Sequence, residues 1–225
     1  MTGDSIKKMN KTILDKPILL CLYGIPGSGK SYVARNLASS VQMAHVSADR
    51  IRNELFQQPR YDAQENAVVL HLMNYMSEEF LSAGVSVVYD VSAMRAGQRR
   101  ALRELARKNH AEYMLVWLQI DAESAFARTQ QRDRRTADDR YAQPLDRLSF
   151  DKTVELMQNP QDEEYIVVSG KHSFGSQKNA VVNYLYKKGI VGSEAVQHSV
   201  AKPELINLVP FNSPFDEGRR NINVA

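Results

Sequence analysis

The chain has 225 residues, of which 43% are hydrophobic and 24% are charged, and its formal net charge at pH 7 is +3. This length is enough to bury a full core, and the ordinary composition excludes a disordered or fibrous chain. No apolar run approaches the ~18 residues that a membrane span needs, and residues 1–16 lack the apolar stretch of a signal peptide. The sequence therefore predicts one cytoplasmic α/β domain with extra segments and no membrane partner.

The first predicted strand covers residues 17–23 and carries the single cysteine, Cys21, which we expect to be a core residue. A glycine-rich turn and a helix over 31–41 follow it. The turn fits the pattern G-x-x-x-x-G-K-[ST] in the strand–turn–helix context that a phosphate-binding loop requires. A glycine-rich turn without function is the alternative, but four constrained positions in this context seldom arise by chance. The residues predicted to bind the nucleotide here are Gly24, Ile25, Pro26, Gly27, Ser28, Gly29, Lys30 and Ser31.

The chemistry of this loop suits a polyphosphate. Glycine lacks a Cβ, so backbone N–H groups can curl around the β-phosphate, and the following helix adds its positive N-terminal end. We expect Lys30 to reach the β- and γ-phosphates and the Ser31 hydroxyl to ligate Mg²⁺. ATP and Mg²⁺ are therefore the predicted cofactors.

Strands and helices alternate through most of the remaining chain. A stripe of apolar residues at helical spacing in 65–84 predicts a helix face in the core. The alternation predicts an α/β fold with a five-stranded parallel sheet, right-handed crossovers and helices on both faces. The further strands are expected at 43–47, 85–90, 112–120 and 165–168, and the further helices from residue 48 and at 65–84, 95–110, 122–131, 144–157 and 176–188.

The predicted elements divide the chain into three parts. Residues 1–16 form a polar N-terminal leader, and residues 17–192 form the α/β domain. Inside the domain, the segment at about 128–144 is too rich in Arg and Asp to bury itself, so we expect it to form a lid. Residues 193–225 form an irregular C-terminal tail, in which 205–209 is one further strand candidate.

Two carboxylates are predicted at the ligand-binding edge of the sheet, because ligands of parallel sheets lie beyond the carboxyl ends of the strands. Asp49 follows the second strand and is placed to take a proton from an attacking hydroxyl. Arg52 shares its helix face and could bind an anionic group of the same acceptor. The alternative for Asp49 is a helix N-cap. Asp90 ends the third strand and is expected to hold Mg²⁺ through water or to orient Arg52 in the acceptor site; a carboxylate that merely ends a strand is its alternative.

Arg128 and Arg132 are four residues apart and therefore share a helix face that leads into the predicted lid. Arginines on a lid can close over the γ-phosphate, expel water and stabilise the transition state. We assign Arg128 to the nucleotide and Arg132 to catalysis, with Arg134 and Arg135 directly after them. The alternative is a solvated loop neutralised by its own aspartates.

Three other features receive weaker assignments. The basic helix over 95–108 is expected to be a solvated face rather than a nucleic-acid groove, because it lacks aromatic residues for stacking. The five histidines have no metal-ligand spacing and receive no role. Residues 170–173 are expected to form a loop beside the adenine.

Taken together, these motifs resemble the group of P-loop kinases that includes polynucleotide 5′-hydroxyl kinases and zeta-toxin-like proteins, many of which are known as AAA-type ATP-binding proteins. The resemblance spans roughly residues 17–190. The motifs that carry it are the loop at 24–31, Asp49-x-x-Arg52, the strand that ends in Asp90, and Arg128-x-x-x-Arg132.

The resemblance implies a P-loop NTPase fold of the adenylate-kinase type with an Arg-rich lid. It also implies that Asp49 is the general base, that Arg52 binds an acceptor phosphate and that Arg128 and Arg132 are lid arginines. One difference is that Val91-Ser92-Ala93 stands where a Thr-Asn pair often follows the strand carboxylate.

The sequence thus predicts a Mg²⁺-dependent phosphotransferase that moves the γ-phosphate of ATP to a hydroxyl acceptor, with Lys30, Asp49 and Arg132 as catalytic residues. The acceptor is either a nucleic acid with a 5′-hydroxyl or a small molecule, including a phosphorylated one. A slow ATPase or nucleotide-dependent switch that acts through a protein partner is the alternative. A third, weaker interpretation is a nucleic-acid-binding protein that uses the basic helix over 95–108.

Overall fold

A computed structural model describes residues 11–91, 95–132, 141 and 145–193. Several predicted features lie outside this part of the chain: most of the leader, Ser92 and Ala93, Arg134 and Arg135 of the predicted lid, and the tail from residue 194. The strands are β1 (Ile18–Tyr23), β2 (Met43–Ser47), β3 (Ser86–Asp90), β4 (Glu112–Gln119) and β5 (Ile166–Ser169). The helices are α1 (Lys30–Ser40), α2 (Ala48–Leu55), α3 (Ala63–Ser82), α4 (Ala96–Lys108), α5 (Ala122–Gln130), α6 (Arg147–Glu155) and α7 (Phe174–Lys187).

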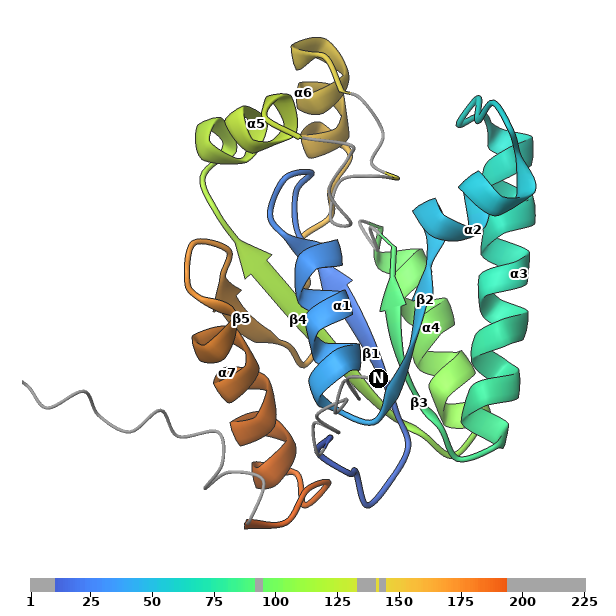
Figure 1. The fold of residues 1–225 in the computed structure, drawn as a ribbon, viewed down its shortest axis with the longest axis vertical. Helices are drawn as coiled ribbons and strands as arrows, with labels where there is room; N and C mark the ends of the chain where they lie inside the picture. The colour runs from blue at the N-terminus through green and yellow to red at the C-terminus, as the bar shows by residue number, and fades with distance from the viewer. Residues whose placement is uncertain (1–10, 92–94, 133–140, 142–144, 194–225) are drawn as a thin grey trace, which may run out of the picture.

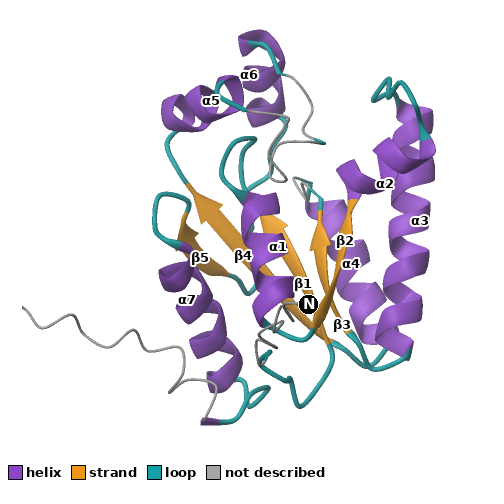
Figure 2. Ribbon diagram, in the orientation of Figure 1, coloured by secondary structure: helices purple, strands orange, loops and turns teal. Residues whose placement is uncertain are grey.

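The five strands form one sheet in the order β2-β3-β1-β4-β5, and every neighbouring pair is parallel. The predicted five-stranded parallel sheet is therefore confirmed. All strands end at the same edge, which is the upper edge in Figure 1, and the glycine-rich loop, α2, α5 and α6 lie there. β1 is the middle strand, and all six of its residues are buried because helices cover both faces (Figure 2).

Alternate residues of β1 contribute to two separate apolar layers, as a strand with period two requires. Leu20 and its neighbours on one face pack against α1 and α7. Cys21, fully buried as predicted, belongs to the other face, which packs against α3 and α4. The predicted core stripe of α3 is confirmed at Val69 and Met73, which are fully buried. Among the described residues, no helix has both the length and the apolar composition to cross a membrane.

The prediction of a solvated basic face on α4 is wrong at Arg99. Its side chain is fully buried, and its guanidinium donates hydrogen bonds of 2.9–3.1 Å to both carboxylate oxygens of Glu163. It also lies 5.1 Å from the centre of the Tyr23 ring. Arg103 Nη1 donates to the same carboxylate at 2.6 Å. This ion-pair cluster ties the segment before β5 to α4, directly behind the end of β1.

Replacing Glu163 by alanine removes the carboxylate that neutralises a buried guanidinium. We expect a loss of about 3–5 kcal/mol in the free energy of unfolding, measured with urea at neutral pH. The matched control is Glu104→Ala, which breaks an exposed pair with Arg107 and should cost less than about 1 kcal/mol. Equal losses in the two variants would contradict a structural role for the buried pair.

Candidate active site

The glycine-rich loop has a backbone that other residues would strain. Gly24, Gly27 and Gly29 have φ angles of +152°, +79° and +96°. A Cβ on Gly27 would lie 2.2 Å from the carbonyl oxygen of Ala125, so the loop packs directly on α5. At Gly29 a Cβ would meet nothing within 4 Å, and glycine is required there by its backbone angle alone. The loop is therefore closely packed at Gly27 and has free space at Gly29.

Lys30, the first residue of α1, lies across this loop. Its Nζ donates hydrogen bonds of 2.9 Å to the carbonyl oxygens of Gly24 and Ile25. Burial lowers the pKa of Lys30 to about 8, and the nearby Asp90 carboxylate opposes this shift. An anion placed in the loop would restore the stability of the ammonium charge, so the site is suited to phosphate.

Asp90 is held by two neighbours. The Ser31 hydroxyl donates to its Oδ1 at 3.2 Å, and His45 Nε2 lies 3.0 Å from its Oδ2. The pairing of Ser47 with Asp90 in the sheet brings His45, two residues earlier, to the same face of the neighbouring strand. The predicted contact between Asp90 and Arg52 is not formed. Sequence analysis missed His45, although the alternation of β2 could have placed it beside the end of β3.

The Ser31 and Asp90 oxygens fit a magnesium ion, which binds to proteins through one or two oxygen ligands and completes its shell with water and phosphate. In the described ranges, no group of three or more His, Cys, Asp or Glu side chains is placed so that it could hold a metal ion by itself.

Asp49 lies in the first turn of α2, and the N-cap position belongs to Ser47. The alternative that Asp49 is an N-cap is therefore wrong. Burial raises the pKa of Asp49 to about 6, and repulsion from Asp90 adds to the shift. Arg52, Arg132 and Lys30 act in the opposite direction. Within the described part of the chain, no hydrogen bond or ion pair engages the Asp49 carboxylate, so a substrate could use it.

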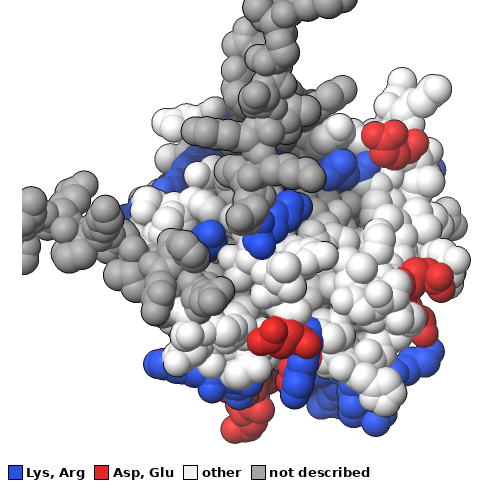
Figure 3. Space-filling view, turned by 60° about the horizontal axis from the view of Figure 1, so that its bottom comes forward, with Lys and Arg blue, Asp and Glu red and all other residues white. Residues whose placement is uncertain are grey.

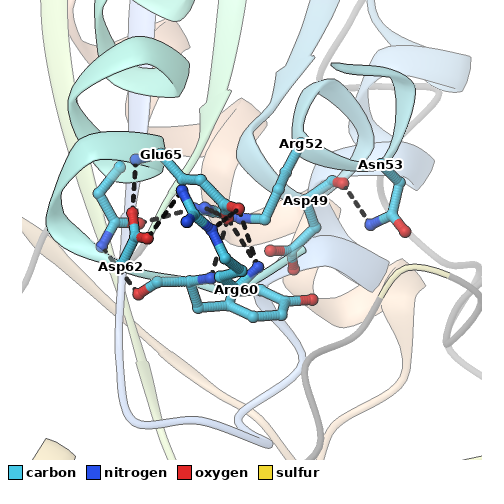
Figure 4. Close-up of polar contacts among 8 residues, drawn as sticks. Asp49, Arg52, Asn53, Arg60, Asp62 and Glu65 are labelled. Atoms are coloured by element: carbon cyan, nitrogen blue, oxygen red, sulfur yellow. Dashed lines mark hydrogen bonds and ion pairs between the residues drawn. The ribbon is translucent and has the colours of Figure 1, made fainter. Parts of the chain in front are cut away.

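Arg52 extends toward Glu65 at the start of α3 (Figure 4). Its side chain is buried, with 5% of the residue exposed. Nη2 donates to Asn66 Oδ1 at 2.7 Å, Nη1 lies 3.5 Å from Glu65 Oε2, and the guanidinium stacks 4.7 Å above the Tyr61 ring. Arg52 therefore connects α2 to α3 through these contacts. Its role as an acceptor ligand stays a prediction.

A cavity of about 460 Å³ joins the remaining parts of the site. It lies at the carboxyl ends of the strands, and its lining contains five cationic side chains and two carboxylates. Such a balance favours a polyanion. The predicted residues that line it are Gly27, Gly29, Ser31, Asp49, Asp90, Arg128 and Arg132, and those not predicted include Tyr32, Arg35, His45 and Arg50.

Two segments close the cavity on the side of β5. Arg128 Nη1 donates to the carbonyl oxygen of Gly170 at 2.9 Å. A Cβ on Gly170 would lie 2.7 Å from the Ser28 carbonyl oxygen, so the loop after β5 packs on the glycine-rich loop. Lys171 and His172 of this loop line the cavity, and their position beside the adenine stays a prediction. Arg132 also lines it, whereas Arg134 and Arg135 lie outside the described residues.

Comparison with solved structures shows the same fold in several proteins. Kti12 of Chaetomium thermophilum, in complex with ADP-AlF3, has 16% identity and a TM-score of 0.57, over 77% of this chain and 100% of that one. The APS kinase CysC of Mycobacterium tuberculosis, in complex with AMPPNP and APS, has 17% identity and a TM-score of 0.54, over 76% and 98%. A chain of the Pnkp1/Rnl/Hen1 RNA repair complex has 19% identity and a TM-score of 0.54, over 63% and 44%.

These likenesses confirm the predicted α/β fold of P-loop NTPases. No curated protein matches the chain. A family model described as an AAA domain matches residues 19–156, which is more than half of the sequence. The chain therefore belongs to the AAA domain family, and the resemblance to the P-loop kinase group noted from its motifs is confirmed.

Proposed function

We propose that this protein is a kinase that transfers the γ-phosphate of ATP to a hydroxyl acceptor with the help of Mg²⁺. The observation that carries the proposal is one cavity that joins the glycine-rich loop, the Ser31–Asp90 pair and the unengaged carboxylate of Asp49. A phosphate-binding loop alone would suit any nucleotide-binding protein. A carboxylate with a raised pKa in the same cavity favours proton transfer as well.

Several observations support ATP as the donor. The cavity is cationic, and the related structures of Kti12 and CysC contain ADP-AlF3 and AMPPNP. We assign Gly24–Ser31 and Arg128 to the nucleotide, and Ser31 and Asp90, through water, to Mg²⁺. When bound, the ion would neutralise charge on the β- and γ-phosphates.

Asp49 is the proposed general base. A carboxyl with a pKa of about 6 is mostly ionised at neutral pH, yet it is a stronger base than an ordinary aspartate. It takes the proton of the acceptor hydroxyl as the new oxygen–phosphorus bond forms and the bond to the β-phosphate oxygen breaks, which releases ADP. Lys30 and Arg132 stabilise the charge on the transferring group.

The nature of the acceptor stays open between two classes. CysC is an APS kinase described in complex with APS, and Pnkp1 belongs to an RNA repair complex. A polynucleotide 5′-hydroxyl and a small molecule are therefore both retained. A screen with radiolabelled ATP against 5′-hydroxyl oligonucleotides, nucleosides and nucleotide sugars would identify the class. The cytoplasmic location and the division into a leader, a kinase domain and a tail also stay predictions.

The other two functions have less support. A slow ATPase or switch that acts through a protein partner could use Asp49 to orient an attacking water, but the similarity to an APS kinase favours transfer to an acceptor. The burial of Arg99 argues against the hypothesis that α4 binds nucleic acid. Three other basic side chains of α4 already form ion pairs with glutamates, namely Arg103, Arg107 and Lys108. On the face shown in Figure 3, basic and acidic side chains are interspersed rather than gathered into one basic surface.

Replacing Lys30 by methionine removes the ammonium group from the loop. We expect ATP affinity, measured by calorimetry with Mg²⁺, to fall about 10–100-fold, as for the loss of a hydrogen bond to a charged group. Lys187→Met, in the exposed last turn of α7, is the matched control and should bind ATP normally. Equal affinity in both variants would remove the basis of the proposal.

Replacing Asp49 by asparagine removes the proposed base with little change in shape. We expect phosphate transfer to fall about 10²–10⁴-fold while ATP affinity stays unchanged. In the native enzyme, kcat/KM should rise with pH near 6, where Asp49 ionises, and fall near 8, where Lys30 loses its proton. The variant should lose the rise near 6. Asp151→Asn is the control. An acceptor-independent hydrolysis that survives in Asp49→Asn, with no transfer by the native protein, would favour the switch instead.

The same substitution should stabilise the fold. Asp49 ionises near its ordinary pKa of 3.8 in the unfolded chain but at about 6 in the folded one. Asp49 therefore lowers the free energy of unfolding increasingly as pH rises from about 4 to about 6, and the full loss is present above that range. At about pH 7, Asp49→Asn should raise the free energy of unfolding by about 3 kcal/mol, and the gain should vanish below about pH 4. Urea unfolding at the two pH values measures this, and a gain at low pH only would contradict it.

A further inference from the structure

The two arginines of α2 occupy different environments. Arg52 is buried and bound to Asn66, as described above. Arg50 is exposed, lines the cavity of about 460 Å³ together with Asp49, and has no hydrogen-bond or ion-pair partner within the described ranges. Arg50 and the proposed general base thus line the same cavity, in which a substrate can reach the exposed Arg50 side chain. Arg52 is buried, and its Nη1 and Nη2 are engaged by Glu65 and Asn66.

Arg50 also lines a second, smaller cavity of about 220 Å³. This side cavity is formed by β2, α2 and α3, and it shares His45, Ser47 and Arg50 with the large one. The rest of its wall is apolar except for Glu54, and consists of Val46, Ile51, Leu55, Leu72 and Met76. Arg50 thus stands at the junction between a cationic cavity and an apolar one.

We propose that Arg50 binds an anionic group of the acceptor and that the side cavity receives a compact, apolar or planar ring attached to that group. The proposal rests on the proposed function, since it places the acceptor hydroxyl at Asp49. The lining of the large cavity contains four other cationic side chains besides Arg50 and two carboxylates, whereas that of the side cavity pairs Arg50 with Glu54, one helical turn later. The anion therefore belongs on the side of the large cavity. The substrate class is a phosphorylated alcohol with a ring, of the kind that a nucleoside monophosphate represents.

The test uses the full chain, saturated with AMPPNP and Mg²⁺ so that the donor site is filled. Calorimetry then measures the binding of adenosine 3′-monophosphate and of adenosine, which lacks the anion. We expect Arg50→Gln to weaken binding of the monophosphate about 10–100-fold and to leave binding of adenosine unchanged. Leu55→Trp, at the exposed rim of the side cavity, should weaken both ligands.

Arg52→Gln is the matched control. It should lower the thermal midpoint of unfolding, because it releases α2 from α3, without a selective loss of the monophosphate over adenosine. A selective loss in a folded Arg52→Gln, with normal binding by Arg50→Gln, would return the acceptor role to Arg52 and overturn the proposal. If the native protein binds AMPPNP but neither nucleoside probe, the substrate class is wrong. If it fails to bind AMPPNP, the proposed function fails first and this proposal fails with it.

Discussion

The site depends on the close packing of the glycine-rich loop. Side-chain atoms at Gly24 or Gly27 would lie 2.6 Å from the Leu118 carbonyl oxygen or 2.2 Å from that of Ala125, so β4 and α5 press on the loop from outside. Gly170 presses on it in the same way through the Ser28 carbonyl. Because these contacts hold the amide groups of the loop in place before a ligand binds, less conformational entropy is lost on binding.

Burial in this site shifts the pKa values of Lys30 and Asp49 in opposite directions. Burial lowers the pKa of Lys30 and raises that of Asp49, so each charge is less stable here than in water. A bound polyphosphate would stabilise the ammonium ion, and an acceptor hydroxyl gives Asp49 a proton to accept. The site therefore stores unfavourable electrostatic energy that substrates can relieve, a usual compromise between stability and activity.

Local patterns were sufficient to predict the sheet and the loop, but not the direction of long side chains. The five strands follow from short apolar runs, and the positions of Asp49 and Asp90 follow from the ends of parallel strands. The burial of Arg99 depends on Glu163, which is 64 residues away, and that of Arg52 on the start of α3. His45 acquires its role only through the pairing of β2 with β3. Such partners are distant in the chain, so no local periodicity reveals them.

The geometry of α2 explains why one arginine is structural while the other faces the cavity. Successive residues of an α-helix are about 100° apart, so residues two apart point in nearly opposite directions. Once Arg52 is buried against Asn66 and Tyr61, Arg50 must face away from that contact. Asp49, next to Arg50, then lies at the same cavity wall. The contact of α2 with α3 therefore decides which arginine can meet a substrate, and the order of residues in the helix alone does not.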